Sequence, residues 1–360
     1  MLDREMTKLE RRLCDALNVS YSVFTGNGTT AMYIAFRALA LQSKKVLFPA
    51  ISCTNPVNAA IYAGYDVDFC DIRLSDYTIA VEKLEEMLQT GMYGIIVPTH
   101  IYGHRYAEQE VKRIAAKYGV LVFEDAAQSY YVGEADVSVL SFGHTKICET
   151  PMGGGAVLTE HADLQNAIRY EKKMLSSNRR PVGEMFDEYR KRYYEIVETS
   201  PSWDLRNEEL KKLQLQSREN FIFDMDGNPL IIPTLNKLNS IVQNREEKTA
   251  LYENRLSSPY IMKAETSCSC RWRYTFLYKG DREFLLEQAR KKGIDISSWY
   301  YSLAGIYKGR HLENADKVEN HVVNLWVDES HPAERLGKEI DILNEIMEVD
   351  YERSKQRTVG

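Results

Sequence analysis

Short apolar runs alternate with amphipathic stretches between residues 20 and 160, and this alternation constrains the fold more than any other feature of the chain. The amphipathic stretches, such as residues 31–41 and 106–118, have the apolar spacing of helices. Strands that alternate with helices build a mostly parallel sheet with helices on both faces. The sequence therefore predicts an α/β fold for the first half, with strands at residues 45–48, 66–69, 94–97, 120–123 and 137–141.

The second half of the chain has a different pattern. Residues 162–219 are rich in Arg, Lys, Glu and Tyr, and we interpret them as a solvent-exposed helical pair without chemistry rather than as a basic binding surface. After Pro233 the pattern predicts a mixed unit, with a long helix, strands at 271–277 and 322–327, and a last helix at 333–349. The predicted organisation is a large α/β domain at 1–234 that includes the polar helical insertion, a smaller C-terminal α+β domain at 235–350, and a frayed tail at 351–360.

The composition is typical of an ordinary globular protein. A length of 360 residues exceeds what one compact core usually holds, and a net charge of −6 lacks the basic excess of a nucleic-acid-binding protein. The chain has neither a run of eighteen apolar residues nor a signal-like start, so we expect a cytoplasmic protein without a membrane partner. Its six cysteines lack zinc spacing, which predicts buried thiols and no metal site.

One acidic and one basic residue stand where strands of the predicted sheet end. Asp125 follows the apolar run at 120–123, and Lys146 follows the run at 137–141, just ahead of a glycine cluster. Open α/β sheets bind ligands at the carboxyl ends of their strands, so the two side chains are expected to meet there. An amine that forms a Schiff base and an acid that keeps a pyridine nitrogen protonated are what pyridoxal 5'-phosphate chemistry requires.

Three motifs together resemble the DegT/DnrJ/EryC1/StrS family of sugar aminotransferases. They are Val122-Phe-Glu-Asp-Ala-Ala-Gln128, then Ser141-Phe-Gly-His-Thr-Lys146, and then Gly153-Gly154-Gly155. The resemblance implies a fold-type I, aspartate aminotransferase-like enzyme with pyridoxal 5'-phosphate bound covalently to Lys146. It also implies that Asp125 pairs with the ring nitrogen of the cofactor and that Lys146 acts as the general base.

The resemblance assigns further residues to the cofactor. The segment Thr25-Gly-Asn-Gly-Thr-Thr-Ala31 precedes a predicted helix, and the unpaired backbone amides at the start of a helix can bind a phosphate group. The resemblance assigns Gly28, Thr29 and Ser141 to the cofactor phosphate. Gln128 matches the family residue beside the ring hydroxyl. Asn220 falls at the family's Asn-Tyr-Arg motif, whose Asn reaches the phosphate held by the partner subunit, so it implies a homodimer with shared active sites.

The chain also departs from the family pattern. Cys53 stands where the family places an aromatic ring over the cofactor, Ile222 replaces the arginine of the Asn-Tyr-Arg motif, and Ala304 replaces a histidine. His100 is interpreted as a structural histidine, and Tyr300 matches a family tyrosine. Because stacking on the pyridine ring normally helps to hold it, the cofactor affinity is expected to differ.

The expected activity is transfer of an amino group, with L-glutamate as the donor, to a keto sugar that is nucleotide-linked in the family. Two alternatives remain at this point. One is a decarboxylase or lyase that uses the same cofactor on an amino acid, which the changed residues at Cys53, Ile222 and Ala304 favour. The other is a non-catalytic protein that has kept the fold, against which the presence of Asp125 and Lys146 argues.

Overall fold

A seven-stranded sheet forms the centre of the larger part of the molecule, in strand order β1-β7-β6-β5-β4-β2-β3. The computed structural model describes residues 6–41, 44–175, 182–225, 227–265 and 268–359. Five neighbouring strands pair in parallel, namely β6, β5, β4, β2 and β3, whereas β7 pairs antiparallel with both β6 and β1. The strands are β1 (Tyr21–Thr25), β2 (Lys45–Pro49), β3 (Val67–Cys70), β4 (Tyr93–Ile96), β5 (Leu121–Asp125), β6 (Val137–Ser141) and β7 (Gly155–Thr159).

The predicted α/β class is confirmed, but two strands of this sheet were not predicted. All five expected apolar runs form strands, β2 to β6, within one or two residues of the expected bounds. The strand β1 lacks a continuous apolar run because Ser22, a buried polar residue, interrupts it. Ser22 donates a hydrogen bond from Oγ to the carbonyl oxygen of Glu10 at 2.9 Å. The strand β7 was not separated from the glycine cluster in which it begins at Gly155.

Six helices of the larger part accompany this sheet. The buried side of α2, which includes Ala31, Ile34 and Ala35, packs on β6 and β7. The helix α1 begins with a capping box in which the side chains of Thr7 and Glu10 bond to each other's backbone amides. The helices are α1 (Lys8–Leu17), α2 (Gly28–Leu39), α3 (Thr54–Tyr62), α4 (Val81–Leu88), α5 (Glu108–Tyr118) and α6 (Ala162–Lys173).

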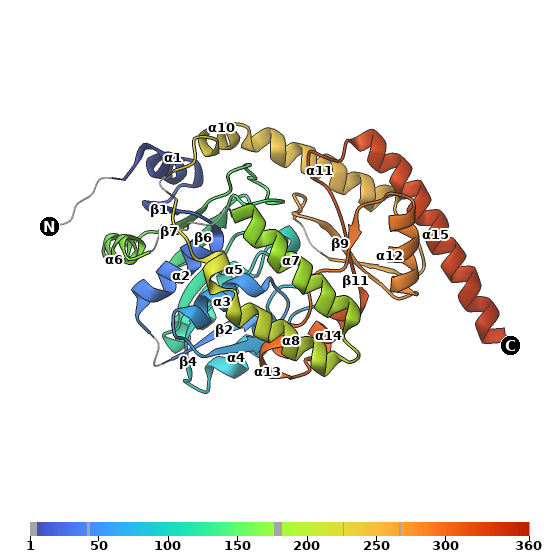
Figure 1. The fold of residues 1–360 in the computed structure, drawn as a ribbon, viewed down its shortest axis with the longest axis horizontal. Coiled ribbons are helices and arrows are strands. Elements are labelled where there is room, and N and C mark those ends of the chain that lie inside the picture. Colours follow the sequence, from blue (N-terminus) through green and yellow to red (C-terminus); the bar gives the residue numbers. More distant parts are fainter. Residues whose placement is uncertain (1–5, 42–43, 176–181, 226, 266–267, 360) are drawn as a thin grey trace.

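The polar insertion is helical as predicted, but it is not only a solvated surface. It continues after α6 with α7 (Val182–Thr199), α8 (Trp203–Gln216) and the short α9 (Arg218–Phe221), while residues 176–181 lie outside the described residues. Figure 1 shows α7 and α8 side by side across the larger part. Charged side chains of α7 are exposed, but Gln214 of α8 is fully buried against α3, where it accepts a hydrogen bond from Asn58 at 2.8 Å.

The C-terminal part has its own antiparallel sheet, in strand order β10-β11-β9-β8, and a separate apolar core around Tyr252, Phe276 and Ile340. Figure 1 places this part at the opposite end of the molecule from α1. Its strands are β8 (Ile261–Lys263), β9 (Tyr274–Tyr278), β10 (Ile296–Ser297) and β11 (Val322–Leu325). Its helices are α11 (Leu238–Arg255), α12 (Arg282–Lys291), α15 (Ala333–Val359) and α14 (Glu313–His321), which contacts β9 and β11. The other two helices of the second half pack on the larger part: α10 (Ile231–Asn236) contacts α1, and α13 (Leu303–Lys308) contacts α8 and β3.

Two boundaries differ from the sequence pattern. The predicted domain boundary between residues 234 and 235 falls inside α10, and the division into domains stays a prediction. The last helix continues to Val359, so the expected tail is helical over its described residues. Just before this extension, Asp350 of α15 accepts hydrogen bonds from the Tyr278 hydroxyl at 2.8 Å and from the backbone N–H of Asp281 at 2.9 Å. These bonds anchor the end of the helix to β9 and to the start of α12. No helix among the described residues combines the length and the apolar character needed to cross a membrane.

Two carboxylates beside His331, in the C-terminal part, lead us to expect that the stability of the protein depends on pH. Burial alone would lower the pKa of His331, but its ring contacts the carboxylates of Asp328 at 2.9 Å and Asp295 at 3.0 Å, and the pKa is raised. Because the pKa of His331 is higher in the folded than in the unfolded protein, the protonated ring raises the free energy of unfolding. This contribution is complete below the unfolded pKa of about 6.5 and disappears as the pH rises through the folded pKa. The melting temperature should therefore fall between about pH 6 and pH 8 by more in the wild type than in His331→Gln. Parallel melting curves for the two proteins would contradict this assignment.

Candidate active site

A cavity of about 250 Å³ lies at the carboxyl ends of β5 and β6 and brings together all eight residues that the sequence assigned to a site. The side chains come from five different segments of the chain, and the first half of the sequence supplies most of them. Apolar side chains of Met32, Pro56 and Phe223 complete much of the wall. The predicted residues that line this cavity are Gly28, Thr29, Cys53, Asp125, Gln128, Ser141, Lys146 and Asn220.

Asp125 is the last residue of β5 and is almost completely buried, with 2% of its surface exposed. Its Oδ1 atom accepts a hydrogen bond from the backbone N–H of Ala127 at 3.0 Å. Burial raises the pKa of Asp125, although this hydrogen bond and the charge of Lys146 act to lower it. A buried carboxylate in this state favours a cationic or proton-donating group of a ligand as its partner.

The residue pair directly behind Asp125 is structural, as the sequence analysis expected for His100. The backbone N–H of His100 donates to the carbonyl oxygen of Asp125 at 3.1 Å, which fixes the end of β5. The His100 ring contacts Glu124 at 2.8 Å, and both side chains are fully buried. Neither residue lines the cavity.

Lys146 follows β6 in a turn that is held in an unusual conformation. Thr145 has a φ of 69°, in the left-handed region that a β-branched residue rarely adopts. The indole N–H of Trp272 donates to the carbonyl oxygen of Thr145 at 2.6 Å, and the Lys146 ammonium lies 5.3 Å from the centroid of one Trp272 ring. Burial lowers the pKa of Lys146, although nearby Cys53 and Asp125 act to raise it, so this amine loses its proton at a lower pH than a lysine in water does.

The other end of the cavity is shaped to receive an anion. The helix α2 begins at Gly28, where the amides of its first turn point outward, and Asn27 caps it by accepting from the Thr30 N–H at 2.7 Å. A Cβ atom at Gly28 would lie 3.0 Å from the Cβ atom of Ser141, so glycine lets the helix start approach the serine hydroxyl closely. The glycine run joins this cradle through a backbone bridge between Asn27 and Gly154.

Gly155 offers a direct test of the cradle. A Cβ atom there would lie 2.3 Å from the backbone carbonyl of Asn27, where no flexible side chain can give way. We expect Gly155→Ala to lower the free energy of unfolding by about 1–3 kcal/mol and to weaken pyridoxal phosphate binding, as measured by denaturant unfolding and ligand titration. Gly227→Ala is the matched control, because a Cβ atom at Gly227 would have no neighbour within 4 Å. Equal behaviour of the two variants would show that the contact with Asn27 is unimportant.

Two tyrosines orient Gln128, and one of them was missed by the sequence analysis. The side-chain carbonyl of Gln128 accepts from the Tyr102 backbone N–H at 2.7 Å, and its amide group donates to the Tyr300 hydroxyl at 3.2 Å. The rings of Tyr102 and Tyr300 stack with a centroid distance of 5.9 Å. Tyr300 had been matched to a family tyrosine, and Tyr102 lies in Pro98-Thr-His-Ile-Tyr-Gly103, a segment that also resembles the family but in which the tyrosine was given no role. Trp272 carried no motif signal.

Cys53 precedes α3 and faces the same cavity. Burial raises the pKa of its thiol, although the charge of Lys146 acts to lower it, so the side chain is a neutral thiol near neutral pH. A thiol supplies neither the area nor the π face of an aromatic ring. Four other cysteines, Cys14, Cys70, Cys148 and Cys270, are buried free thiols as expected.

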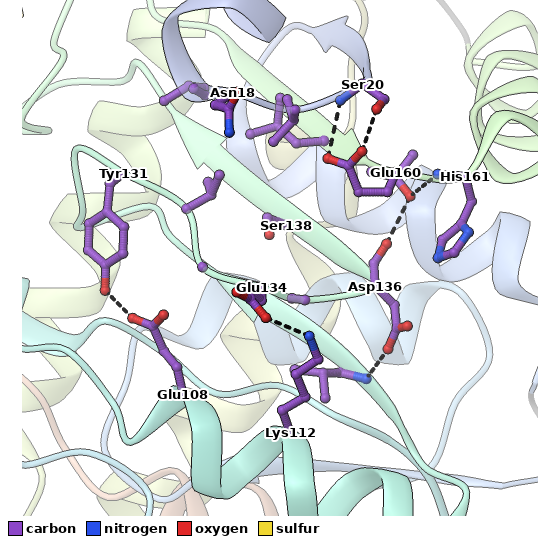
Figure 2. A pocket seen from close by; sticks show the side chains of 18 of the residues that line it. Asn18, Ser20, Glu108, Lys112, Tyr131, Glu134, Asp136, Ser138, Glu160 and His161 are labelled. Carbon is purple, nitrogen blue, oxygen red and sulfur yellow. Dashed lines mark hydrogen bonds and ion pairs between the residues drawn. The ribbon is translucent and has the colours of Figure 1, made fainter.

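A larger hollow of about 1270 Å³ lies elsewhere, on the surface between α5, β6 and the end of α1. Figure 2 shows that its polar side chains face one another: Lys112 contacts Glu134 at 2.6 Å, and the Tyr131 hydroxyl points at Glu108. Its charged lining is mostly acidic and contains none of the predicted site residues. The smaller cavity at the carboxyl ends of the strands therefore remains the candidate active site.

Comparisons with known proteins agree with the resemblance. The model of the DegT/DnrJ/EryC1/StrS aminotransferase family matches residues 2–199. Over 176 residues the chain is 30% identical to a UDP-4-amino-4,6-dideoxy-N-acetyl-beta-L-altrosamine transaminase of Campylobacter jejuni, covering 46% of each protein. Over 164 residues it is 30% identical to a 3-oxo-glucose-6-phosphate:glutamate aminotransferase of Bacillus subtilis, covering 44% of this chain and 37% of that relative. The matched region thus spans about half the length, or less, of these curated relatives.

The similarity of the fold extends over nearly the whole chain. The crystal structure of a DegT DnrJ EryC1 StrS aminotransferase from Brucella abortus superposes with a TM-score of 0.72 and 17% sequence identity, covering 96% of this chain and 91% of the other. The predicted fold-type I architecture is therefore confirmed.

Proposed function

The chain belongs to the DegT/DnrJ/EryC1/StrS aminotransferase family, and from this membership we propose that it is a pyridoxal phosphate-dependent aminotransferase acting on a keto sugar. The observation that carries the proposal is that Asp125 and Lys146 line one cavity together with the anion cradle at Gly28, Thr29 and Ser141. An acid, an amine and a phosphate cradle in one enclosed space are the three groups that this cofactor needs.

The residues of the cavity fit the cofactor chemically. The start of α2 and the hydroxyls of Thr29 and Ser141 would hold the phosphate. Because Gly28 has no Cβ atom, the helix start lies close to Ser141, and both can contact the same phosphate. Asp125 would hold the proton of the ring nitrogen, and Gln128 would donate to the ring hydroxyl. When bound, pyridoxal phosphate supplies an aldehyde that links to amines and a ring that accepts electrons.

Lys146 would carry both the covalent attachment and the proton transfer. Its lowered pKa favours the neutral amine, which is the form that attacks a carbonyl group and accepts a proton. Its Nζ atom would take the proton from the α-carbon of the amino donor. Trp272 would keep this amine in place, because it holds the backbone of Thr145 beside it.

The substrates follow from the relatives rather than from the cavity. The names of the two relatives above specify a nucleotide-linked sugar in one case and a sugar phosphate with glutamate in the other. We propose L-glutamate as the donor and a keto sugar, nucleotide-linked in the first instance, as the acceptor. A cytoplasmic homodimer with shared active sites completes the proposal, and its support is the match of Asn220, which lines the cavity, to the family's Asn-Tyr-Arg motif.

A half-reaction tests the proposed function. The protein is reconstituted with pyridoxal phosphate, and its visible absorption is recorded before and after addition of L-glutamate without an acceptor. We expect loss of the yellow band of the covalently held cofactor and release of one equivalent of 2-oxoglutarate. Carbon dioxide or ammonia released from an amino acid would instead favour the decarboxylase or lyase, and absence of any band would contradict the proposed cofactor.

A further inference from the structure

Two positively charged side chains contact the indole of Trp272, and only one of them has a place in the proposed function. The ammonium of Lys146 lies 5.3 Å from the centroid of a Trp272 ring, and the guanidinium carbon of Arg273 lies 4.7 Å from one. We propose that Arg273 is a positioning residue for Lys146, whose positive charge, held on the shared indole, keeps the amine unprotonated for reaction. The use of that amine rests on the proposed function, whereas the contacts of Arg273 do not.

Arg273 is fixed in place inside the chain. It immediately precedes β9 and is fully buried, and Trp272 is only 1% exposed. Its Nη1 atom donates to the carbonyl oxygen of Trp272 and to Oδ2 of Asp328, both at 3.2 Å. Its guanidinium carbon also lies 4.3 Å from the centroid of a Trp326 ring. Contact with two indoles suits a planar, weakly hydrated cation.

The charge of Arg273 is only partly neutralised by its surroundings. Asp328 is its carboxylate partner, but Asp328 also accepts a hydrogen bond from Ser330 and contacts the ring of His331. Among the described residues, neither Nε nor Nη2 of Arg273 has a hydrogen-bond partner. Burial lowers the pKa of Arg273 to about 10, so the side chain still carries its charge at neutral pH. Because little water screens a buried charge, it acts on neighbouring groups more strongly than an exposed one.

The charges around Lys146 oppose one another. Cys53, which precedes α3, and Asp125, at the end of β5, act to raise the pKa of its amine. The charge of Arg273 acts in the same direction as burial and lowers that pKa. Arg273 therefore offsets the carboxylate that would otherwise favour the ammonium form of Lys146.

Trp272 fixes the placement of the two cations relative to each other. Its indole N–H donates to the carbonyl oxygen of Thr145, the residue before Lys146. Its backbone N–H donates to the carbonyl oxygen of Tyr102 at 2.9 Å. These bonds hold the indole independently of Arg273, so a neutral side chain at that position should change the charge near Lys146 more than its placement.

Competitive labelling of the apoprotein tests the proposal without any cofactor. Trace acetic anhydride is added at a series of pH values, and acetylation of Lys146 is quantified by mass spectrometry, which gives the pH at which half of the amine is unprotonated. We expect Arg273→Met to raise this midpoint by about 0.5–1 pH unit, and Arg273→Lys, which keeps the charge, to raise it by less than about half as much. An unchanged midpoint in Arg273→Met, or an equal rise in Arg273→Lys, would overturn the proposal.

A second comparison avoids leaving a buried carboxylate unpaired. Removal of Arg273 alone takes away the partner of Asp328, which can weaken the fold. Asp328→Asn is therefore compared with the double variant Asp328→Asn/Arg273→Met, and we expect the midpoint to be higher in the double variant. Equal midpoints would contradict a role for the charge. Arg255→Met, which removes an exposed partner of Asp341, is the control and should leave the midpoint unchanged.

The pH dependence of the half-reaction connects Arg273 to the proposed function. In protein reconstituted with pyridoxal phosphate, the rate with L-glutamate should fall off on the acid side at a higher pH in Arg273→Met than in wild type. A rate lowered equally at all pH values would indicate a structural role alone and would overturn the proposal. If wild type itself took up no cofactor, the proposed function would fail, while acetylation of the apoprotein would still decide whether Arg273 acts on Lys146.

Discussion

Lys146→Ala is expected to abolish covalent attachment of pyridoxal phosphate while leaving noncovalent binding in place. The cradle at Gly28 and Ser141 is formed by other segments, so the phosphate end should still bind after the amine is removed. The half-reaction with L-glutamate should slow by at least about 10²-fold, because the variant lacks the positioned base. Borohydride reduction followed by mass spectrometry measures the covalent link, and a phosphate-end readout such as equilibrium dialysis measures retained binding.

The control for this variant is Lys112→Ala. Lys112 is half exposed and pairs with Glu134 in the separate hollow, so its loss should change neither labelling nor turnover. An intact covalent adduct in Lys146→Ala would mean that a different amine anchors the cofactor. Unchanged labelling with lost turnover would assign Lys146 to proton transfer alone.

The position of the acid and the amine could be predicted because it depends on a local pattern. Asp125 and Lys146 each follow an apolar run, and the carboxyl ends of the parallel strands β5 and β6 meet at one edge. Knowing which runs are strands was therefore enough to place both residues at one site. The neighbouring β7 was missed because its first residue, Gly155, was assigned to the glycine cluster of the cofactor site rather than to a strand.

The support of Lys146 could not be predicted in the same way. Trp272 lies far along the chain from Thr145, and their hydrogen bond exists only because the C-terminal part folds back onto the turn after β6. A single tryptophan, here between Arg271 and Arg273, has no sequence signal that distinguishes it from an ordinary core residue. The role of Tyr102 was missed for another reason, because its backbone amide rather than its side chain contacts Gln128.

Asn220 illustrates a different limit. The resemblance placed it at a phosphate held by the partner subunit, and within one chain it lines the cavity that contains the predicted phosphate end. A motif specifies which residues meet and not which copy of the chain supplies them. Within one chain, hydrogen bonds from Asn27 and Thr30 to Phe221 hold the segment of Asn220 beside this cavity, and no local sequence pattern specifies these contacts.

Asp125→Asn is expected to separate catalysis from stability. The substitution keeps the shape of the side chain and an oxygen that can accept from Ala127, so the cofactor should still become attached at Lys146. A neutral amide stabilises a protonated ring nitrogen far less than a carboxylate does, and the half-reaction with L-glutamate should slow by about 10²-fold or more.

The same substitution should not weaken the fold of the protein without cofactor. The raised pKa of Asp125 means that folding disfavours its charged form, so at pH values above the folded pKa the carboxylate reduces stability. Asp125→Asn removes that cost, and the melting temperature of the apoprotein should stay equal or rise. Asp341→Asn, at an exposed salt bridge with Arg255, is the control and should change neither quantity appreciably. Near-normal turnover would remove Asp125 from the mechanism. A lower melting temperature would instead show that its carboxylate is a structural group, because a residue kept for catalysis is one whose replacement slows the reaction without weakening the fold.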